Sequence, residues 1–88
     1  MNIDIRSSFL KDLKKIIDPS LKEQVEQVIS SVKKAETLSD IPGLKKLKGY
    51  KVFYRIKVGD YRMGVSIENN LVTFFVFMPR KDIYKFFP

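Results

Sequence analysis

The sequence of 88 residues contains no cysteine and no histidine. Without cysteine, the chain forms no disulfide framework and no zinc ribbon, and it has no thiolate nucleophile. Without histidine, it lacks the commonest general acid–base side chain, the Ser-His-Asp arrangement and nearly all transition-metal sites. Any catalysis must therefore use lysine, arginine, tyrosine, aspartate or glutamate, and we expect no metal and no cofactor.

Long apolar runs are also missing. No segment approaches the roughly 20 apolar residues that a membrane-spanning helix needs. The first residues, Met1–Arg6, are charged from the start and do not resemble a signal peptide. We therefore expect a cytoplasmic protein, and the length predicts a single domain over residues 1–88.

Acidic residues are few in comparison with basic ones. Ten Asp and Glu stand against seventeen Lys and Arg, which gives a formal net charge of +7. A charge of this sign favours a polyanionic partner such as nucleic acid. The alternative is that surface lysines serve solubility alone, so the position of the cations in the fold matters.

The segment Tyr50–Phe77 predicts three consecutive β-strands over residues 50–58, 61–67 and 71–77. Gly59-Asp60 and Asn69-Asn70 separate them, and these residues tolerate the positive φ of two-residue hairpin turns. Counting outward from each turn fixes the register. The count predicts a core face with Tyr54, Ile56, Val58, Tyr61, Met63, Val65, Ile67, Val72, Phe74 and Val76.

The other face of this predicted sheet gathers cations and aromatic rings. Lys57 faces Arg62 across the first turn, with Arg55 beside them, and no acid lies on that face before Glu68. Like charges directly opposite each other destabilise a ladder, so stability does not explain the arrangement. Around the second turn, the count pairs Met63 with Val76, Gly64 with Phe75 and Arg62 with Phe77.

The residues before the sheet predict one strand and two helices. Ile3 and Ile5 alternate with polar residues in a short edge strand, and apolar residues at helical spacing follow from Ser7 or Ser8 to Ile17. Asp18 and Pro19 end this helix and begin the next, as its N-cap and first helical residue. The second helix is expected to bury Leu21, Val25, Val28, Ile29 and Val32.

The fold class predicted is therefore α+β. A short N-terminal strand and an α-helical hairpin pack on an antiparallel sheet in the order β-α-α-β-β-β, followed by a short C-terminal helix or tail. Residues 37–49 show no periodicity and predict a loop, whose Lys45, Lys46 and Lys48 are either a solvated connector or an extension of the basic surface. Pro79 ends the last strand and delivers Arg80 towards Lys57.

Together, the predictions place Arg55, Lys57, Arg62 and Arg80 among the rings of Phe53, Phe75, Phe77 and Tyr84. Cations bind phosphates, and unpaired bases stack on aromatic rings with about 1–3 kcal/mol each, so single-stranded RNA suits this surface. The alternative is that a protein segment covers the exposed phenylalanines. The expected RNA contacts are Lys45, Lys46, Lys48, Phe53, Phe75, Phe77 and Lys81.

Three segments resemble the RelE/ParE superfamily of toxins from type II toxin–antitoxin systems. They are Leu44–Tyr50 (LKKLKGY), Tyr54–Arg62 (YRIKVGDYR) and Arg80–Tyr84 (RKDIY), of which the second is the most specific. The resemblance covers nearly the whole chain. It implies a ribosome-dependent endoribonuclease that cuts mRNA in the A site and inhibits translation. It also implies a cognate antitoxin that neutralises the toxin in a hetero-oligomeric complex.

The resemblance also implies roles for five residues. Arg55 and Lys57 match the basic pair assigned to activating the 2′-hydroxyl and stabilising charge, and Arg62 matches the phosphate-binding arginine. Arg80 matches the arginine assigned to protonating or stabilising the leaving 5′-oxygen. Tyr84 matches the tyrosine that positions the nucleotide.

Two positions depart from the family pattern, and two other functions stay open. Residue 55 is arginine where the well-characterised ribonucleases carry lysine, so only Lys57 is left as an amine base. Pro79 stands where many relatives have histidine. One alternative is a ParE-like toxin that inhibits DNA gyrase, which the retained cations disfavour because gyrase-directed members generally lack them. The other is a non-catalytic module that binds RNA or a partner.

Overall fold

The computed structural model describes residues 1–88 and confirms the α+β class and the order of the predicted elements. It adds one short strand and a short 3-10 turn between the second helix and the sheet. None of the helices has the length and hydropathy that crossing a membrane requires. The elements are β1 (Asn2–Ile5), α1 (Ser7–Lys14), α2 (Pro19–Lys34), a 3-10 turn (Leu38–Asp40), β2 (Leu44–Lys46), β3 (Phe53–Val58), β4 (Tyr61–Glu68), β5 (Leu71–Pro79) and α3 (Arg80–Phe86).

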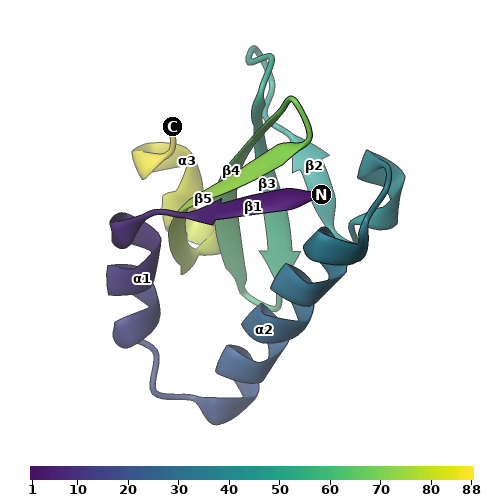
Figure 1. Ribbon diagram of the computed structural model, residues 1–88. Coiled ribbons are helices and arrows are strands. Elements are labelled where there is room, and N and C mark those ends of the chain that lie inside the picture. Colours follow the sequence, from purple (N-terminus) through teal and green to yellow (C-terminus); the bar gives the residue numbers. More distant parts are fainter.

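The five strands form one sheet in the order β1-β5-β4-β3-β2 (Figure 1). β1 pairs with β5 in parallel at one edge, and all other neighbours are antiparallel. Both predicted two-residue turns are present, with a positive φ at Gly59, Asn69 and Asn70. The register between β3 and β4 follows the prediction, so Lys57 lies opposite Arg62.

Residues 44–46 form an edge strand, so the prediction of a loop is wrong there. Leu44 pairs with Ile56 and packs against the main core, while Leu47 is buried in a second cluster. The two leucines thus anchor the segment from both faces of the sheet. Two anchoring leucines three residues apart, on opposite faces, do not show the alternation typical of a strand. The pattern therefore indicated a loop. The lysines between them discourage this exposed edge from pairing with a further strand.

The predicted register between β4 and β5 is wrong beyond Phe74. The pairing shifts between Gly64 and Val65, because Phe75 is an extra residue in β5 and has no partner in the register. The register therefore pairs Gly64 with Val76, Met63 with Phe77 and Arg62 with Met78. A side chain changes face with each one-residue shift, so Phe77 turns to the core face and Val76 leaves it.

The main core lies between this face of the sheet and the helices α1 and α2 (Figure 1). Its fully buried side chains include Phe9 of α1 and Val32 of α2. The predicted helix start is confirmed, because the Asp18 carboxylate accepts a hydrogen bond from the Ser20 N–H at 2.9 Å. α1, however, ends at Lys14, earlier than predicted, and Ile17 is 90 % exposed in the connection.

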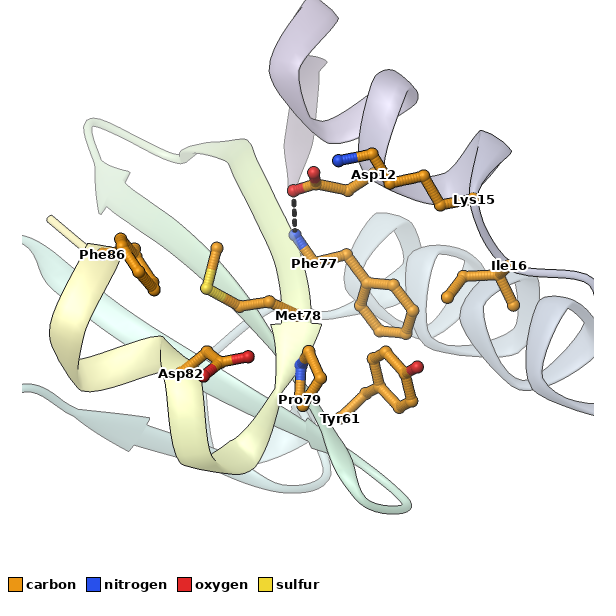
Figure 2. A pocket seen from close by; sticks show the side chains of 9 residues that line it. All are labelled: Asp12, Lys15, Ile16, Tyr61, Phe77, Met78, Pro79, Asp82 and Phe86. Carbon is orange, nitrogen blue, oxygen red and sulfur yellow. Dashed lines mark hydrogen bonds between the residues drawn. The ribbon is translucent and has the colours of Figure 1, made fainter.

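α1 also protects the part of β5 that the short strand β1 does not reach. The Ser8 hydroxyl donates to the Phe75 carbonyl, and the Asp12 carboxylate accepts the Phe77 N–H at 2.9 Å (Figure 2). Pro79, at the end of the strand, has no N–H to leave unpaired. Side chains of the helix therefore satisfy an edge that would otherwise be open to another strand.

A second apolar cluster lies on the opposite face of the sheet, under α3. Leu47, Ile83 and Phe87 are its buried members. Phe53, Phe75, Val76 and Met78 pack against them and are partly buried. A helix of seven residues is not stable by itself, so these contacts hold α3 in place.

The 3-10 turn provides a prediction about acid stability. The Asp40 carboxylate accepts the N–H groups of Thr37 and Glu36, both at 3.0 Å. These bonds, led by the one from Thr37, hold the pKa of Asp40 below its ordinary value of 3.8. A carboxyl group with a lower pKa in the folded state adds stability above its unfolded pKa. That stability is lost as the pH falls through the folded pKa.

We therefore expect Asp40→Ala to lower the melting temperature near neutral pH and to have less effect as the pH falls below 3.8. Thermal unfolding followed by circular dichroism at a series of pH values measures this difference. Glu36→Ala is the control, because its side chain accepts neither bond. A difference between Asp40→Ala and the unmutated chain that stays constant into strong acid would contradict the prediction.

Candidate nucleic-acid interface

Arg62 lies at the centre of the basic residues and is held rigidly. It is the second residue of β4, and only 6 % of its surface is exposed. Its Nη1 donates to the carbonyls of Gly59 and Tyr61, both at 2.9 Å, so the side chain folds back over the turn between β3 and β4. A buried cation that is oriented by backbone carbonyls keeps its direction when an anion approaches.

Part of the Arg62 guanidinium stays open to solvent. No buried side-chain nitrogen or oxygen lacks a hydrogen-bond partner. The Nε and Nη2 atoms of Arg62 make no hydrogen bond, so both must reach the surface. A guanidinium carries five N–H donors, and Nη1 accounts for two of them. Three donors are therefore left for a ligand, in the fork geometry that binds phosphate.

The charges around Arg62 are mostly of the same sign. Burial lowers the pKa of Arg62 below its ordinary value, and the cations of Arg55 and Arg80 lower it further. Tyr84 and Asp60 act in the opposite direction and raise it. An arginine remains charged at neutral pH in spite of such a shift. Three guanidinium groups thus share one small region, a strong field for an anion.

Arg55 connects the sheet to the C-terminal helix. It lies on β3, opposite Gly64, and its Nε donates to the Tyr84 hydroxyl at 2.8 Å. Tyr84 is on α3 and is 63 % exposed. The bond therefore holds the end of an aromatic side chain whose surface is otherwise open, beside the guanidinium groups.

An open hollow borders these residues where α3 begins. It measures about 590 Å³ and is lined by Asp60, Pro79, Arg80, Lys81 and Tyr84. The Arg80 N–H donates to the Asp60 carbonyl at 2.9 Å, which ties the start of α3 to the turn between β3 and β4. The volume is within the range of sites that bind small organic ligands, so it can accept a nucleotide.

The family model of the ParE toxin of type II toxin–antitoxin systems, parDE, matches residues 3–84. The chain belongs to this toxin family. Toxin RelE3 of Methanocaldococcus jannaschii is 33 % identical over 89 positions, which cover all of both chains. The resemblance seen in the sequence is thus confirmed.

Solved structures of related proteins agree with the fold of this toxin. In the RelB–RelE complex from Methanococcus jannaschii, the matched chain has a TM-score of 0.79 and 31 % identity. That match covers 96 % of the toxin described here and 98 % of the other chain. YoeB from Staphylococcus aureus has a TM-score of 0.72, covering 89 % and 94 % of the two chains. At 17 % identity, YoeB supports the fold alone.

Among the predicted catalytic residues, the toxin brings Arg55, Arg62, Arg80 and Tyr84 together. Lys57 lies opposite Arg62 in the register and is exposed. It lines a hollow beside α2, separate from the one that Arg80 and Tyr84 line. Of the residues predicted to bind RNA, Lys81 lines the hollow where α3 begins, and Lys45 lies opposite Arg55. Lys46 lies opposite Tyr54, which packs against the main core, so Lys46 is on the other face of the sheet and does not join this group. Lys48 is exposed.

The prediction that Phe77 stacks on RNA is wrong. Phe77 is 3 % exposed and belongs to the main core, on the face that α1 and α2 cover. Its ring stacks on that of Tyr61, with centroids 5.0 Å apart and an angle of 21° (Figure 2). The extra residue at Phe75 causes this change of face, so no base can reach the ring.

Phe53 and Phe75 keep their predicted face but are partly covered. The ring of Phe87 lies 5.6 Å from that of Phe53 and 5.9 Å from that of Phe75. A segment of the toxin itself, the end of α3, is therefore what covers them. The sequence carried one signal that we did not use. Gly64 lies in the interior of a predicted strand, and such a glycine often marks a close approach of another group.

A second hollow, of about 330 Å³, lies on the other side of α3 (Figure 2). It is mainly apolar, and two carboxylates, of Asp12 and Asp82, outnumber the one cation that lines it, Lys15. Carboxylates repel phosphate, so this hollow does not extend the basic surface. An RNA backbone is therefore expected on the side of α3 that carries Arg80 and Lys81.

Proposed function

We propose that this toxin is a ribosome-dependent endoribonuclease that cuts mRNA in the A site without a metal ion. The observation that carries the proposal is the gathering of Arg55, Arg62 and Arg80 beside an open hollow. The side chains of these arginines donate no hydrogen bond to a carboxylate of the toxin itself. Such a field suits the phosphate of RNA.

The chemistry of RNA cleavage matches what these side chains can supply. RNA carries its own nucleophile, the 2′-hydroxyl, which must be placed in line with the phosphorus. Attack produces a phosphorane with two negative charges, and preorganised cations stabilise it more than they stabilise the substrate. Arg62 is preorganised in this sense, because two carbonyls fix it before RNA binds.

We assign the roles by position. Arg62 and Arg55 hold the phosphate, and Arg80, which lines the hollow, stabilises the leaving 5′-oxygen. The exposed ring of Tyr84 stacks on a base and orients the nucleotide. Lys57, the register partner of Arg62, supplies the base that accepts the proton of the 2′-hydroxyl.

A cognate antitoxin is part of the proposal. The Methanococcus jannaschii relative is known as a complex of RelE with RelB. By this relationship, and because the toxin carries a net charge of +7, we propose an acidic antitoxin that covers the basic surface in a hetero-oligomer. Because the substrate is mRNA on the ribosome, the toxin acts in the cytoplasm.

Substitution of Lys57 or Arg80 by alanine tests the proposal. We expect each change to lower the rate of mRNA cleavage on translating ribosomes by about 10²-fold or more, since each removes a group that acts in the transition state. Primer extension on the message measures the cuts. Lys33→Ala, which removes an exposed cation from α2, is the control and should cleave normally.

The outcome also separates the alternatives that the sequence left open. Unchanged cleavage in both variants would refute the assigned roles. Intact message together with a DNA damage response after induction would instead indicate a gyrase inhibitor. Toxin bound to ribosomes that carry intact message would indicate a non-catalytic binding module.

A further inference from the structure

The position of Tyr84 depends on contacts that its own side chain does not make. The ring is 63 % exposed, and the bond from Arg55 is its one hydrogen bond. A single hydrogen bond between exposed side chains contributes little to stability and cannot by itself fix the position of a short helix. The ring must therefore be placed by the backbone of α3, and α3 by what anchors it.

α3 has an anchor at each end and one in the middle. At its start, the Arg80 N–H bonds to the Asp60 carbonyl. In the middle, Ile83 is fully buried. At its end, Phe87 is 7 % exposed, and its N–H donates to the Ile83 carbonyl at 3.0 Å, which closes the last turn. Tyr84 lies between the two apolar anchors.

The ring of Phe87 packs unusually close to Gly64, directly beside the basic residues. A Cβ atom placed on Gly64 would be 2.7 Å from both Cγ and Cδ2 of the Phe87 ring. The ring thus fits against the sheet only because residue 64 has no side chain. Gly64 is the register partner of Arg55. The Phe87 ring therefore packs beside Arg55, the residue that bonds to Tyr84.

We propose that Phe87 is a positioning residue, which by packing on Gly64 holds α3 where Tyr84 meets Arg55. Phe87 is covered by Phe53 and Phe75 and does not touch RNA. Its effect passes through the placement of Tyr84. The part that concerns cleavage rests on the proposed endoribonuclease function, whereas the part that concerns the Arg55–Tyr84 bond does not.

The neighbouring phenylalanine provides a matched control. Phe86, the last residue of α3, directly precedes Phe87 and has the same side chain, but it is 66 % exposed and lines the hollow on the other side of the helix. Phe86→Ala and Phe87→Ala remove the same atoms. Only the second removes the contact with Gly64, so their difference isolates the effect of that contact.

The first measurement uses the purified toxin and needs no RNA. The Nε–H signal of Arg55 in a ¹H–¹⁵N NMR spectrum reports its bond to Tyr84, and Tyr84→Phe provides the reference spectrum without the bond. We expect Phe87→Ala to move the signal to the reference position and Phe86→Ala to leave it unchanged. An unmoved signal in a folded Phe87→Ala toxin overturns the proposal.

The second measurement is the single-turnover rate of mRNA cleavage at saturating toxin. Phe87→Ala is expected to lower this rate by about 10²-fold, because a small misplacement of a catalytic group is enough for such a loss. The toxin concentration at half-saturation should hardly change. A higher half-saturating concentration with a normal rate would make Phe87 part of the binding surface and overturn the proposal.

A conservative variant covers the case in which Phe87→Ala does not fold. Phe87→Leu keeps an apolar side chain on Gly64 and should restore most of the rate and the Arg55 signal. If the unmutated toxin cuts no RNA, the proposed function fails, and the NMR comparison alone decides whether Phe87 positions Tyr84. A folded Phe87→Leu toxin that behaves like Tyr84→Phe in both measurements contradicts our inference.

Discussion

Replacing Arg62 by methionine is expected to slow mRNA cleavage by about 10²–10³-fold without lowering the stability of the folded toxin. Arg62 is 6 % exposed, and burial together with Arg55 and Arg80 holds the pKa of its guanidinium below the ordinary value. A cation whose pKa is lower in the folded state reduces the free energy of unfolding at every pH below that pKa. The cost is therefore present throughout the neutral range.

Methionine removes this cost and keeps most of the packing. Its unbranched side chain fills the same channel, and replacing a buried charged group by an apolar one is often neutral or stabilising. The carbonyls of Gly59 and Tyr61 lose their shared donor, but they lie in and directly after the turn between β3 and β4, where water can replace it. We expect a melting temperature equal to that of the unmutated toxin or higher.

The loss of activity has a different cause. In the proposed reaction, Arg62 places a fixed positive charge where the phosphorane forms, and removal of one such preorganised group typically costs about 10²–10³-fold in rate. Arg62→Lys should be intermediate, because an ammonium keeps the charge but not the fork of donors. Thermal unfolding and primer extension on the same preparations measure the two effects.

Arg6→Met is the matched control for this prediction. Arg6 is exposed and lies over the ring of Phe75, at 5.8 Å from its centroid. Its removal takes away the same charge but should leave cleavage unchanged and bring no gain in stability. A loss of more than about 1 kcal/mol in Arg62→Met would show instead that the two carbonyl bonds outweigh the cost of burial.

Much of the fold could be predicted because its decisive signals are local. Asn69 and Asn70 specify a hairpin by their tolerance of positive φ, and Asp18 with Pro19 specifies a helix start. The gathering of Arg55 near Arg62 follows from counting a few residues outward from the turn at Gly59. Such counts are reliable over a short distance from an undistorted turn.

The features that were missed depend on contacts between distant segments. The extra residue at Phe75 gives no recognisable sequence pattern, because residues 74–77 are all apolar and each could lie on either face of the sheet. The packing of Phe87 on Gly64 joins positions 23 residues apart and depends on a missing side chain. The site was therefore predicted where it depends on the first hairpin and missed where it depends on β5 and α3.

Phe77→Ala is expected to be among the most destabilising single substitutions in the toxin. Phe77 is 3 % exposed and packs on Tyr61 and Phe9, so its removal leaves a cavity between β5 and α1. Truncating a buried phenylalanine typically costs about 3–5 kcal/mol. A small domain has about 5–15 kcal/mol in total, so a large part of its stability would be lost.

Phe75→Ala provides the comparison that tests the register itself. Its side chain is half-buried on the other face, so we expect a cost of only about 1 kcal/mol. Urea unfolding of both variants measures the difference in free energy. Without the extra residue in β5, Phe77 would lie on the partly open face and Phe77→Ala would be the milder change. The order of the two costs therefore decides which face each ring occupies, and with it whether either can contact RNA.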